Sequence, residues 1–184
     1  TYPEATFTEG SYRTVRDAIS DIQDIEPGKE VTDSYFTLPP HPEAQGLEKE
    51  LRGRCLHNHI TTATRETALS RFKALKAGEN FHDLSPELKT TYSNAERTQN
   101  TIYMRLKYDE PSGTVVNVRK SMWIHPELDR AISIREAARL QTFPDSFIFE
   151  GTKDSQYQQV GNAVPPFLAK AVAESIISIL DQVQ

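Results

Sequence analysis

Near its C-terminus the chain reads Gln158-Gln159-Val160-Gly161-Asn162-Ala163-Val164-Pro165-Pro166, directly ahead of an apolar run. Proline is tolerated where a helix starts, because the amide there has no acceptor within the helix, so we expect a helix from about Val164 to Leu180. After Gly161, the short polar side chain of Asn162 can cap amides and also reach a ligand. The helix carries an apolar stripe that needs a partner surface, formed by Leu168, Val172, Ile176 and Ile179.

A second informative stretch is Arg135-Glu136-Ala137-Ala138-Arg139-Leu140-Gln141-Thr142-Phe143-Pro144-Asp145. Ser133 stands two residues before it, and Ser133 with Glu136 has the spacing of a capping box. In that motif the hydroxyl accepts a hydrogen bond from the third amide, while the carboxylate reaches back to the first. The predicted helix runs to about Gln141 and ends before Pro144, because proline disfavours helical backbone in the residue that precedes it.

Together the two stretches resemble the ninth and tenth motifs of the DNA cytosine-5 methyltransferases, and the resemblance covers nearly the whole chain. Two segments are similar to the region after the family's eighth motif, Tyr2–Phe7 and Thr14–Ile19. Others are similar to its target-recognition region: His57-Asn58-His59, Arg71–Leu75, Gly78–Asn80, Arg105-Leu106, Pro111–Thr114 and His125–Arg130.

The resemblance implies an enzyme that binds S-adenosylmethionine in a Rossmann-like domain and holds duplex DNA in a cleft. There the target cytosine is flipped out, a Cys thiolate attacks C6, a Glu steadies the ring at N3, and C5 takes the methyl group. Nothing in the chain resembles the family's cofactor loop, Pro-Cys nucleophile or Glu-Asn-Val segment. We therefore expect the DNA-reading part of such an enzyme, inactive alone and partnered by an N-terminal catalytic domain or subunit. Whether it is a piece of one chain or a natural specificity subunit stays open, as does the rival class of a non-catalytic DNA-binding module.

The predicted fold class is α+β, a small irregular recognition domain with short strands and helices. Its C-terminal helix would pack on a Rossmann-like domain that these residues do not supply. We expect residues 1–132 to form the recognition domain and residues 133–184 to complete the large domain. Helical spacing predicts further helices at Thr14–Ile22 and Glu66–Ala77. Ile102–Leu106 and Thr114–Val118 read as strands of a hairpin or open loop, because a turn-rich segment separates them.

Composition sets further limits on the class of protein. Only 37% of the residues are hydrophobic and the mean hydropathy is -0.57, which favours a loop-rich structure. The single cysteine excludes an internal disulfide and a Cys-based zinc site, and we expect no metal. No signal peptide is visible, and Lys170 and Glu174 interrupt the apolar C-terminal run, so we expect a soluble, cytoplasmic protein without a membrane span.

The net charge of -5 conceals a strong asymmetry along the chain. Residues 1–50 hold 4 basic and 11 acidic side chains, whereas residues 51–80 hold 6 and 2, and residues 97–120 hold 5 and 2. Attraction to phosphate depends on the local field, so the two basic segments can form a DNA-facing surface. The alternative is that they are ordinary solvated faces.

Within these segments we expect DNA contacts on or beside the hairpin, from Arg105, Thr114, Arg119 and Lys120. A guanidinium can take both guanine acceptors in the major groove. The alternative is that Arg105 and Arg119 pair with Asp109 or Glu110 across the turn. The expected phosphate contacts are Arg65, Arg71 and Arg97.

The remaining candidates each have a structural alternative. For Arg135, Arg139 and Gln141 we expect a scaffold helix whose arginines bridge loops, and which thereby orients the recognition domain. The resemblance implies that Asn162, Ala163 and Val164 close one side of the S-adenosylmethionine pocket, although Asn162 can also be a plain cap. Cys55 follows no proline, so we expect it only to pack. His57-Asn58-His59 lacks the ββα surroundings of a His-Asn-His nuclease, which favours a structural or DNA-backbone role.

Overall fold

The computed structural model describes residues 2–31, 35–40 and 46–181. Two short strands, β1 (Tyr35–Thr37) and β2 (Cys55–His57), pair antiparallel with Phe36 opposite Leu56. The other elements are α1 (Val15–Ile19), η1 (Ser20–Ile22), α2 (Gly46–Leu51), α3 (Glu66–Ala74), η3 (Phe81–Asp83), α4 (Pro86–Lys89), η4 (Ala95–Arg97), α5 (Val118–Ser121), α6 (Ile134–Leu140), α7 (Lys153–Asn162) and α8 (Pro166–Asp181). The described residues therefore form a mixed structure with few strands and several helices, as expected.

The main body is built around one apolar core in which α1 packs on α6 and α6 on α7. Val15, Ala18 and Ile19 of α1 are buried there, alongside Ala137 and Ala138 of α6. The core thus joins residues from both sides of position 132. The boundary between residues 132 and 133 stays a prediction, and residues on both sides of it pack in this one core.

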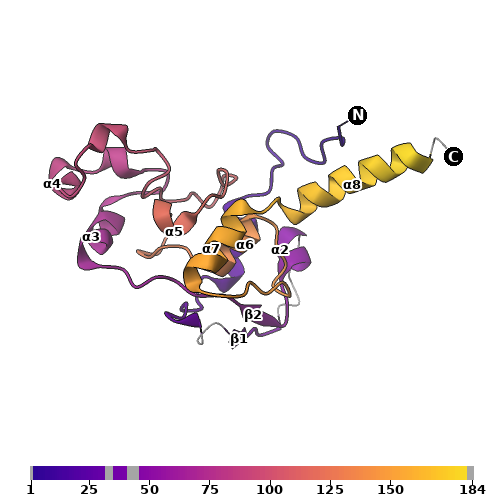
Figure 1. Ribbon diagram of the computed structural model, residues 1–184, viewed down its shortest axis with the longest axis horizontal. Helices are drawn as coiled ribbons and strands as arrows, with labels where there is room; N and C mark the ends of the chain where they lie inside the picture. Colours follow the sequence, from indigo (N-terminus) through magenta and orange to yellow (C-terminus); the bar gives the residue numbers. More distant parts are fainter. Residues whose placement is uncertain (1, 32–34, 41–45, 182–184) are drawn as a thin grey trace.

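A smaller core lies at the far end of the molecule, where α3 and α4 form an outer lobe (Figure 1). Phe72, Phe81 and Tyr103 are its buried rings, with ring centroids of Phe72 and Tyr103 5.9 Å apart. Ile124 and Ala131 also belong to this cluster, although their sequence neighbours Trp123 and Ile132 belong to the main core. These short segments connect the lobe to the main body.

Several predicted elements differ from the structure. The helix predicted at Thr14–Ile22 is present as α1 followed by η1, with Thr14 and Asp17 in a capping box. The helix predicted to reach Ala77 ends at Ala74 as α3. The capping box of Ser133 and Glu136 opens α6 as expected.

The hairpin prediction is wrong. Residues 102–106 and 114–118 form no strands, and the amide of Leu106 donates instead to the carbonyl of Ile124. The amide of Tyr103 likewise donates to the carbonyl of Ser121. The amides of Tyr103 and Leu106 are therefore satisfied by residues 121–124 rather than by a second hairpin strand, and Val118 opens α5.

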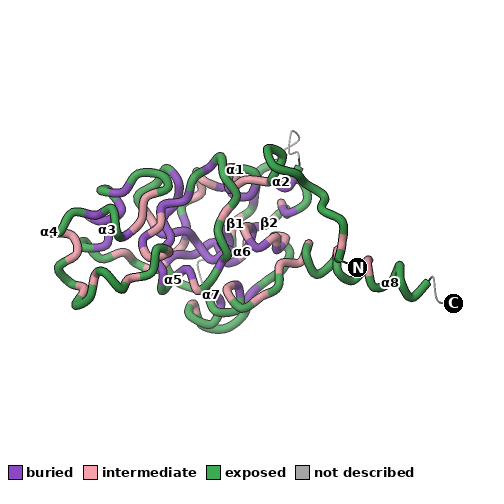
Figure 2. The backbone as a smooth tube through the Cα atoms, turned by 90° about the horizontal axis from the view of Figure 1, so that it is seen from above, coloured by how far each residue is buried: buried purple, intermediate pink, exposed green. Residues whose placement is uncertain are grey.

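Figure 1 shows α8 projecting away from the main body, and in Figure 2 most of its backbone has the colour of exposed residues. None of the residues Pro166–Asp181 is fully buried, and Leu168, Ile176 and Ile177 are each more than half exposed. The N-terminal segment from Tyr2 to Thr6 lies against one side of the helix, near Ala171 and Glu174. The apolar stripe predicted from the sequence is real and largely uncovered.

By length and composition alone, the stretch Lys153–Asp181 is long and apolar enough for one membrane-crossing helix, and an 18-residue window within it has a mean hydropathy of 1.5. The described backbone breaks this stretch, because α7 ends at Asn162 and α8 begins at Pro166. At 1.5 Å per residue, α8 alone is about 24 Å long, shorter than a hydrocarbon core of about 30 Å. Length and composition of this stretch are therefore weak evidence for a membrane span.

Candidate nucleic-acid interface and the scaffold behind it

Arg135 lies at the centre of a buried network under α6. Its Nε donates to the carbonyl of His57 at 2.7 Å, and its two terminal nitrogens donate to the carbonyls of Pro144 and Phe147 and to Oδ1 of Asn58. The side chain is fully buried, and burial lowers the pKa of the guanidinium to about 10. Arg135 therefore bridges β2 and the loop after α6.

Arg139, one turn further along α6, makes the second bridge. Its Nε and Nη2 form a two-pronged pair with the carboxylate of Asp145, at 2.9 and 2.7 Å. Nη1 donates to the carbonyl of Ala18 and pairs with Asp21, which fastens α1 to α6. Burial opposes the charge, but the hydrogen bonds to Asp145 raise the pKa of Arg139 above its usual value. A buried charge of this kind is tolerated only when it is fully paired.

Glu136 is the third charged residue of α6, and it too is buried. Arg130 donates to both of its carboxylate oxygens, at 2.8 and 2.7 Å, and the amide of Ser133 donates at 2.7 Å. Burial favours the neutral acid, but the charge of Arg130 outweighs it and lowers the pKa of Glu136 to about 2. His125 lies nearby, and burial lowers its pKa to about 4.

The His57-Asn58-His59 triplet belongs to this scaffold. His59 is fully buried; its Nε2 lies 2.9 Å from the carbonyl of Ile25 and its Nδ1 lies 3.0 Å from the hydroxyl of Ser133. Asn58 donates to the carbonyl of Phe149 and to Gln156, both at 2.9 Å. Among the described residues no cluster of His, Cys, Asp or Glu is arranged to hold a metal ion. These contacts are structural.

Gln141 ties the end of α6 to the end of α7. Its Nε2 donates to the carbonyl of Val160 at 3.0 Å and to that of Ala163 at 3.3 Å. Asn162 is the last residue of α7, so the expectation that it opens a helix is wrong. Residues 163–165 separate the two helices, and Pro166 is the first residue of α8. An early amide of α8 finds its acceptor outside the helix: the amide of Phe167 donates to the hydroxyl of Thr142 at 3.1 Å.

The cofactor candidates lie where α7 ends and α8 has not yet begun. Asn162 is exposed and Val164 is 62% exposed, while Ala163 is half-buried. Among the described residues, the side chain of Asn162 has no hydrogen-bond partner in the protein. The three residues form a short exposed edge beside the buried network.

Arg105 is not placed to read DNA. It is 5% exposed, and its guanidinium donates to the carbonyls of Leu75, His125, Leu128 and Phe72 and to Asp129. Arg71, expected to contact phosphate, is 4% exposed and donates to the carbonyl of Leu88 and to the hydroxyls of Tyr103 and Thr91. The two guanidiniums are buried and hydrogen-bonded within the structure, where they hold segments of the outer lobe together, so neither is exposed toward DNA.

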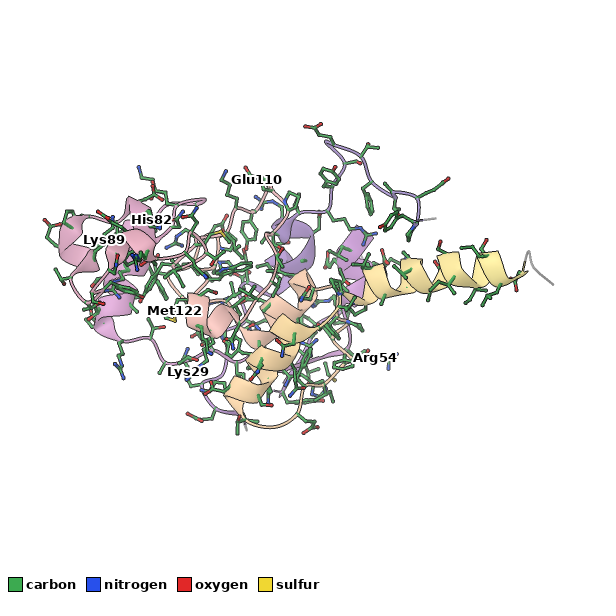
Figure 3. All side chains as sticks on the ribbon, turned by 45° about the horizontal axis from the view of Figure 1, so that its top comes forward. Lys29, Arg54, His82, Lys89, Glu110 and Met122 are labelled. Atoms are coloured by element: carbon green, nitrogen blue, oxygen red, sulfur yellow. The ribbon has the colours of Figure 1, made fainter. Side chains whose placement is uncertain are left out.

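The other predicted DNA residues are exposed, in two groups. Thr114, Arg119 and Lys120 lie on or just before α5, and Arg119 pairs with Asp154 of α7 rather than with Asp109 or Glu110. Arg65 precedes α3 and Arg97 ends η4, both in the outer lobe. Figure 3 marks the two regions by Met122, directly after α5, and by Lys89 and His82, which lie together in the outer lobe.

Cys55 lies in β2, opposite Thr37 of β1, with its sulfur 3.2 Å from the hydroxyl of Tyr35. That hydrogen bond raises the pKa of Tyr35. No mobile loop after a cofactor-binding strand surrounds this thiol, so its setting is that of a strand residue.

Sequence reasoning missed Asp21 and Asp145 as scaffold residues, and it did not foresee Asn58 as the partner of Arg135. Asp21 and Asp145 accept hydrogen bonds from Arg139 of α6. Asn58 accepts one from Arg135 of the same helix. The available signal was the arginine-rich α6 itself, because two guanidiniums beside alanines in one helix require acceptors when that helix is buried.

This chain is similar to known proteins over almost its whole length. Residues 3–178 match the model of the C-5 cytosine-specific DNA methylase family. The type II methyltransferase M.DdeI of Desulfomicrobium norvegicum is 35% identical over 95% of this chain and 45% of its own length. M1.HphI of Haemophilus parahaemolyticus is 34% identical over 97% of this chain and 40% of its own length. DNA (cytosine-5)-methyltransferase 4 of Arabidopsis thaliana is 34% identical over 89% of this chain and 12% of its own length.

A solved structure from E. coli, described as a candidate DNA modification methyltransferase encoded within a prophage, shares the fold. Its TM-score is 0.68 at 24% identity, over 91% of this chain and 47% of that one. The chain spans less than half the length of these relatives. The match over almost all of the 184 residues assigns the chain to the C-5 cytosine-specific DNA methylase family.

Proposed function

We propose that this chain is the DNA-reading part of a DNA (cytosine-5-)methyltransferase, an enzyme that transfers a methyl group from S-adenosylmethionine to C5 of cytosine in duplex DNA. The family match and the names of the relatives support this activity. Because the chain spans less than half of the bacterial relatives, we assign it the recognition role and assign the methyl transfer to a separate catalytic part.

The observation that supports separate recognition and catalytic parts is the uncovered apolar face of α8. Leu168 is 54% exposed, Ile176 53% and Leu180 59%, on a helix that projects from the main body (Figure 1). Covering an apolar side chain of this size stabilises by about 1.5–3 kcal/mol when burial is complete. We propose that α8 docks on a Rossmann-like catalytic domain and thereby joins the two parts.

The segment before α8 fits one wall of a cofactor site. Asn162 offers an exposed amide and Val164 an exposed apolar side chain, at the entrance to the docking helix. When bound, S-adenosylmethionine supplies the methyl group. In our proposal Asn162, Ala163 and Val164 close one side of its pocket, and the catalytic part provides the rest.

DNA would be held by the two exposed cationic groups. We propose that Thr114, Arg119 and Lys120 lie nearest the bases and that Arg65 and Arg97 contact phosphates. Three buried residues contact neither bases nor phosphates: Arg135, Arg139 and Gln141. In our proposal they orient the DNA-reading segment and the exposed edge at Asn162 relative to each other. Cys55, bonded to Tyr35 within β2, takes no part in catalysis.

The experiment is a complementation assay. The chain alone should transfer no methyl group from radiolabelled S-adenosylmethionine to a mixed-sequence duplex. Mixed with the N-terminal part of a type II relative, which lacks its own recognition region, the chain should restore transfer. Methylation by the chain alone would contradict the proposal.

A non-catalytic DNA-binding module is the competing function. Titration with duplex DNA at two salt concentrations separates the two, because binding to phosphates alone loses affinity steeply with salt and shows no preference among sequences. A preference for one duplex that persists at the higher salt would support the recognition role.

A further inference from the structure

Helix α7 touches the segment Val116–Lys120 at two points. The first is Gly161, in the last turn of α7. A Cβ atom built on Gly161 would lie 2.7 Å from the carbonyl carbon of Val116 and 2.8 Å from the amide nitrogen of Asn117. Such distances are not tolerated between a real Cβ and backbone, so any other residue would displace one of the two segments. The absence of a side chain lets helix and segment meet backbone to backbone.

The second point is Asp154, in the first turn of α7, whose carboxylate pairs with the guanidinium of Arg119. Asp154 and Gly161 are seven residues apart, which is close to two helical turns, so both face the same side of α7. Between them Val160 of α7 and Val118 of α5 are buried in the main core. One face of α7 therefore supports the segment along two turns.

The position of α7 is itself fixed from α6. Gln141 donates to the carbonyls of Val160 and Ala163, the residues that flank Gly161 and Asn162. Tyr157, one turn before Gly161, is buried, and its hydroxyl donates to the carbonyl of Ile132 at 3.2 Å. The helix that contacts Val116–Lys120 is thus rigidly seated, whereas the segment it contacts is exposed at Arg119 and Lys120.

We propose that Gly161 and Asp154 are positioning residues for sequence recognition. Gly161 sets how close Val116 and Asn117 approach the main body, and Asp154 sets the direction of Arg119, whose side chain remains 40% exposed toward solvent. Neither residue contacts DNA; both determine where Thr114, Arg119 and Lys120 meet it. This inference rests on the proposed DNA-reading function.

The test is selection of bound duplexes from a random-sequence pool by the chain, followed by affinity measurement on the selected duplex and a scrambled one. Gly161→Ala should reduce the ratio of the two affinities by about tenfold or more, the effect of misplacing one base-reading pair. Affinity for the scrambled duplex at low salt should stay within about twofold, because it depends on charge rather than on placement. A merely structural role would lower both affinities together.

The matched control is Gln158→Ala, which also places alanine in α7. Gln158 is exposed, and its side chain makes no hydrogen bond or ion pair with the described residues. This variant should keep the selected sequence and the affinity ratio of the unmodified chain.

A second variant covers the case in which Gly161→Ala does not fold. Asp154→Asn removes one charge from an exposed pair and leaves the core untouched. It should weaken discrimination at the base pair that Arg119→Ala also affects, and the double variant should show less than the sum of the two effects. Equal preference in Asp154→Asn and the unmodified chain at that base pair would overturn the role of Asp154.

The outcomes separate the inference from the function on which it rests. If the unmodified chain selects no sequence, the proposed reading function fails. If it selects a sequence, and folded Gly161→Ala selects it with the same affinity ratio, the function stands and the positioning role of Gly161 is refuted.

Discussion

Asn58 combines a strained backbone with a saturated side chain. Its φ of 60° lies in the left-handed region, which asparagine tolerates better than most residues. It is 2% exposed, and Oδ1 accepts from the amide of Phe149 and from Arg135 while Nδ2 donates to Phe149 and Gln156. Both features are needed at one position, which few residue types can satisfy.

Substitution of Asn58 separates the two features. Asn58→Gly keeps the left-handed backbone without strain but loses all four side-chain hydrogen bonds, so the free energy of unfolding should fall by about 3 kcal/mol. Asn58→Ala loses the same bonds and adds backbone strain, so it should be about 1 kcal/mol less stable than Asn58→Gly. Urea unfolding followed by circular dichroism measures the free energy of unfolding of both variants. Equal stability of the two would show that backbone strain at position 58 does not affect stability.

His125 should make stability depend on pH. Burial lowers its pKa to about 4, below the value of about 6.5 of an exposed histidine, so the unfolded chain binds more protons between these values. The contribution of His125 to stability is complete above about pH 6.5 and is lost as pH falls toward 4. Glu136, with a pKa of about 2, loses its contribution only below about pH 4.5, so it does not affect the part of this window above that pH.

His125→Asn tests this assignment, because the asparagine oxygen can replace Nδ1 as acceptor for the amides of Glu127 and Leu128. Between pH 7.5 and 5 the variant should lose about 2 kcal/mol less unfolding free energy than the unmodified chain. The measurement is a series of urea titrations across that range. Identical slopes for the two proteins would assign the pH dependence to other groups, such as His59, whose pKa burial also lowers.

At the scale of elements, α8 depends on a residue distant in sequence. Thr142 has a φ of 65°, unusual for a β-branched residue, and its hydroxyl accepts from the amide of Phe167 in the first turn of α8. Helix starts leave such amides without partners inside the helix. The hydroxyl of Thr142 therefore helps to anchor α8 to the loop after α6.

Thr142→Val keeps the shape and β-branching, and so the backbone strain, while removing that acceptor. The first turn of α8 should become less stable by about 1 kcal/mol, the usual effect of losing a helix-capping group. Hydrogen exchange at the amides of Phe167 and Leu168 should accelerate about fivefold, while exchange in α6 should not change. Unchanged exchange at Phe167 would exclude the anchoring role.

The α5 segment and the outer lobe should respond differently to loss of a cation. Lys120 is exposed on α5, so Lys120→Ala should reduce the dependence of log K on log salt concentration by about 0.9, the loss of one phosphate contact, without changing stability. Arg105→Ala removes five hydrogen bonds from a buried site and should instead destabilise the lobe. Salt titration of DNA binding and thermal unfolding, performed on both variants, distinguish the two; a changed unfolding temperature for Lys120→Ala would contradict its placement at the surface.

For the whole molecule, the decisive feature is that α8 adds little to the main core: Phe167 in its first turn packs against that core, but no residue of the helix is fully buried. The residues of α1, α6 and α7 form the core, whereas Leu168 and Ile176 of α8 remain more than half exposed. Leu168→Glu combined with Ile176→Glu should leave the unfolding free energy of this chain within about 0.5 kcal/mol. In the complementation assay the same variant should lose methyl transfer.

Lys170→Glu is the control for that prediction, because Lys170 lies on another side of α8, its side chain is 73% exposed and it forms an exposed pair with Glu174. It should still complement. Retained complementation by the double variant would show that α8 docks elsewhere or not at all, and would leave the DNA-binding proposals intact.

Local sequence was sufficient for the features that depend on neighbours a few residues away. The capping box of Ser133 and Glu136, the helix at α3 and the apolar stripe of α8 all follow from side chains within two turns of one another. The family resemblance followed from the order of short motifs and was supported by the match over residues 3–178.

Only the tertiary structure decided which arginines are free to meet DNA. Arg105 and Arg119 are both cations in a basic stretch. Arg105 is buried and donates to carbonyls of distant residues, whereas Arg119 pairs with Asp154 at the surface. The same long-range hydrogen bonds replaced the expected hairpin with pairing to residues 121–124. A sequence states which groups can donate and accept; their partners are chosen when distant segments pack, because each buried polar group must be satisfied by whatever lies beside it.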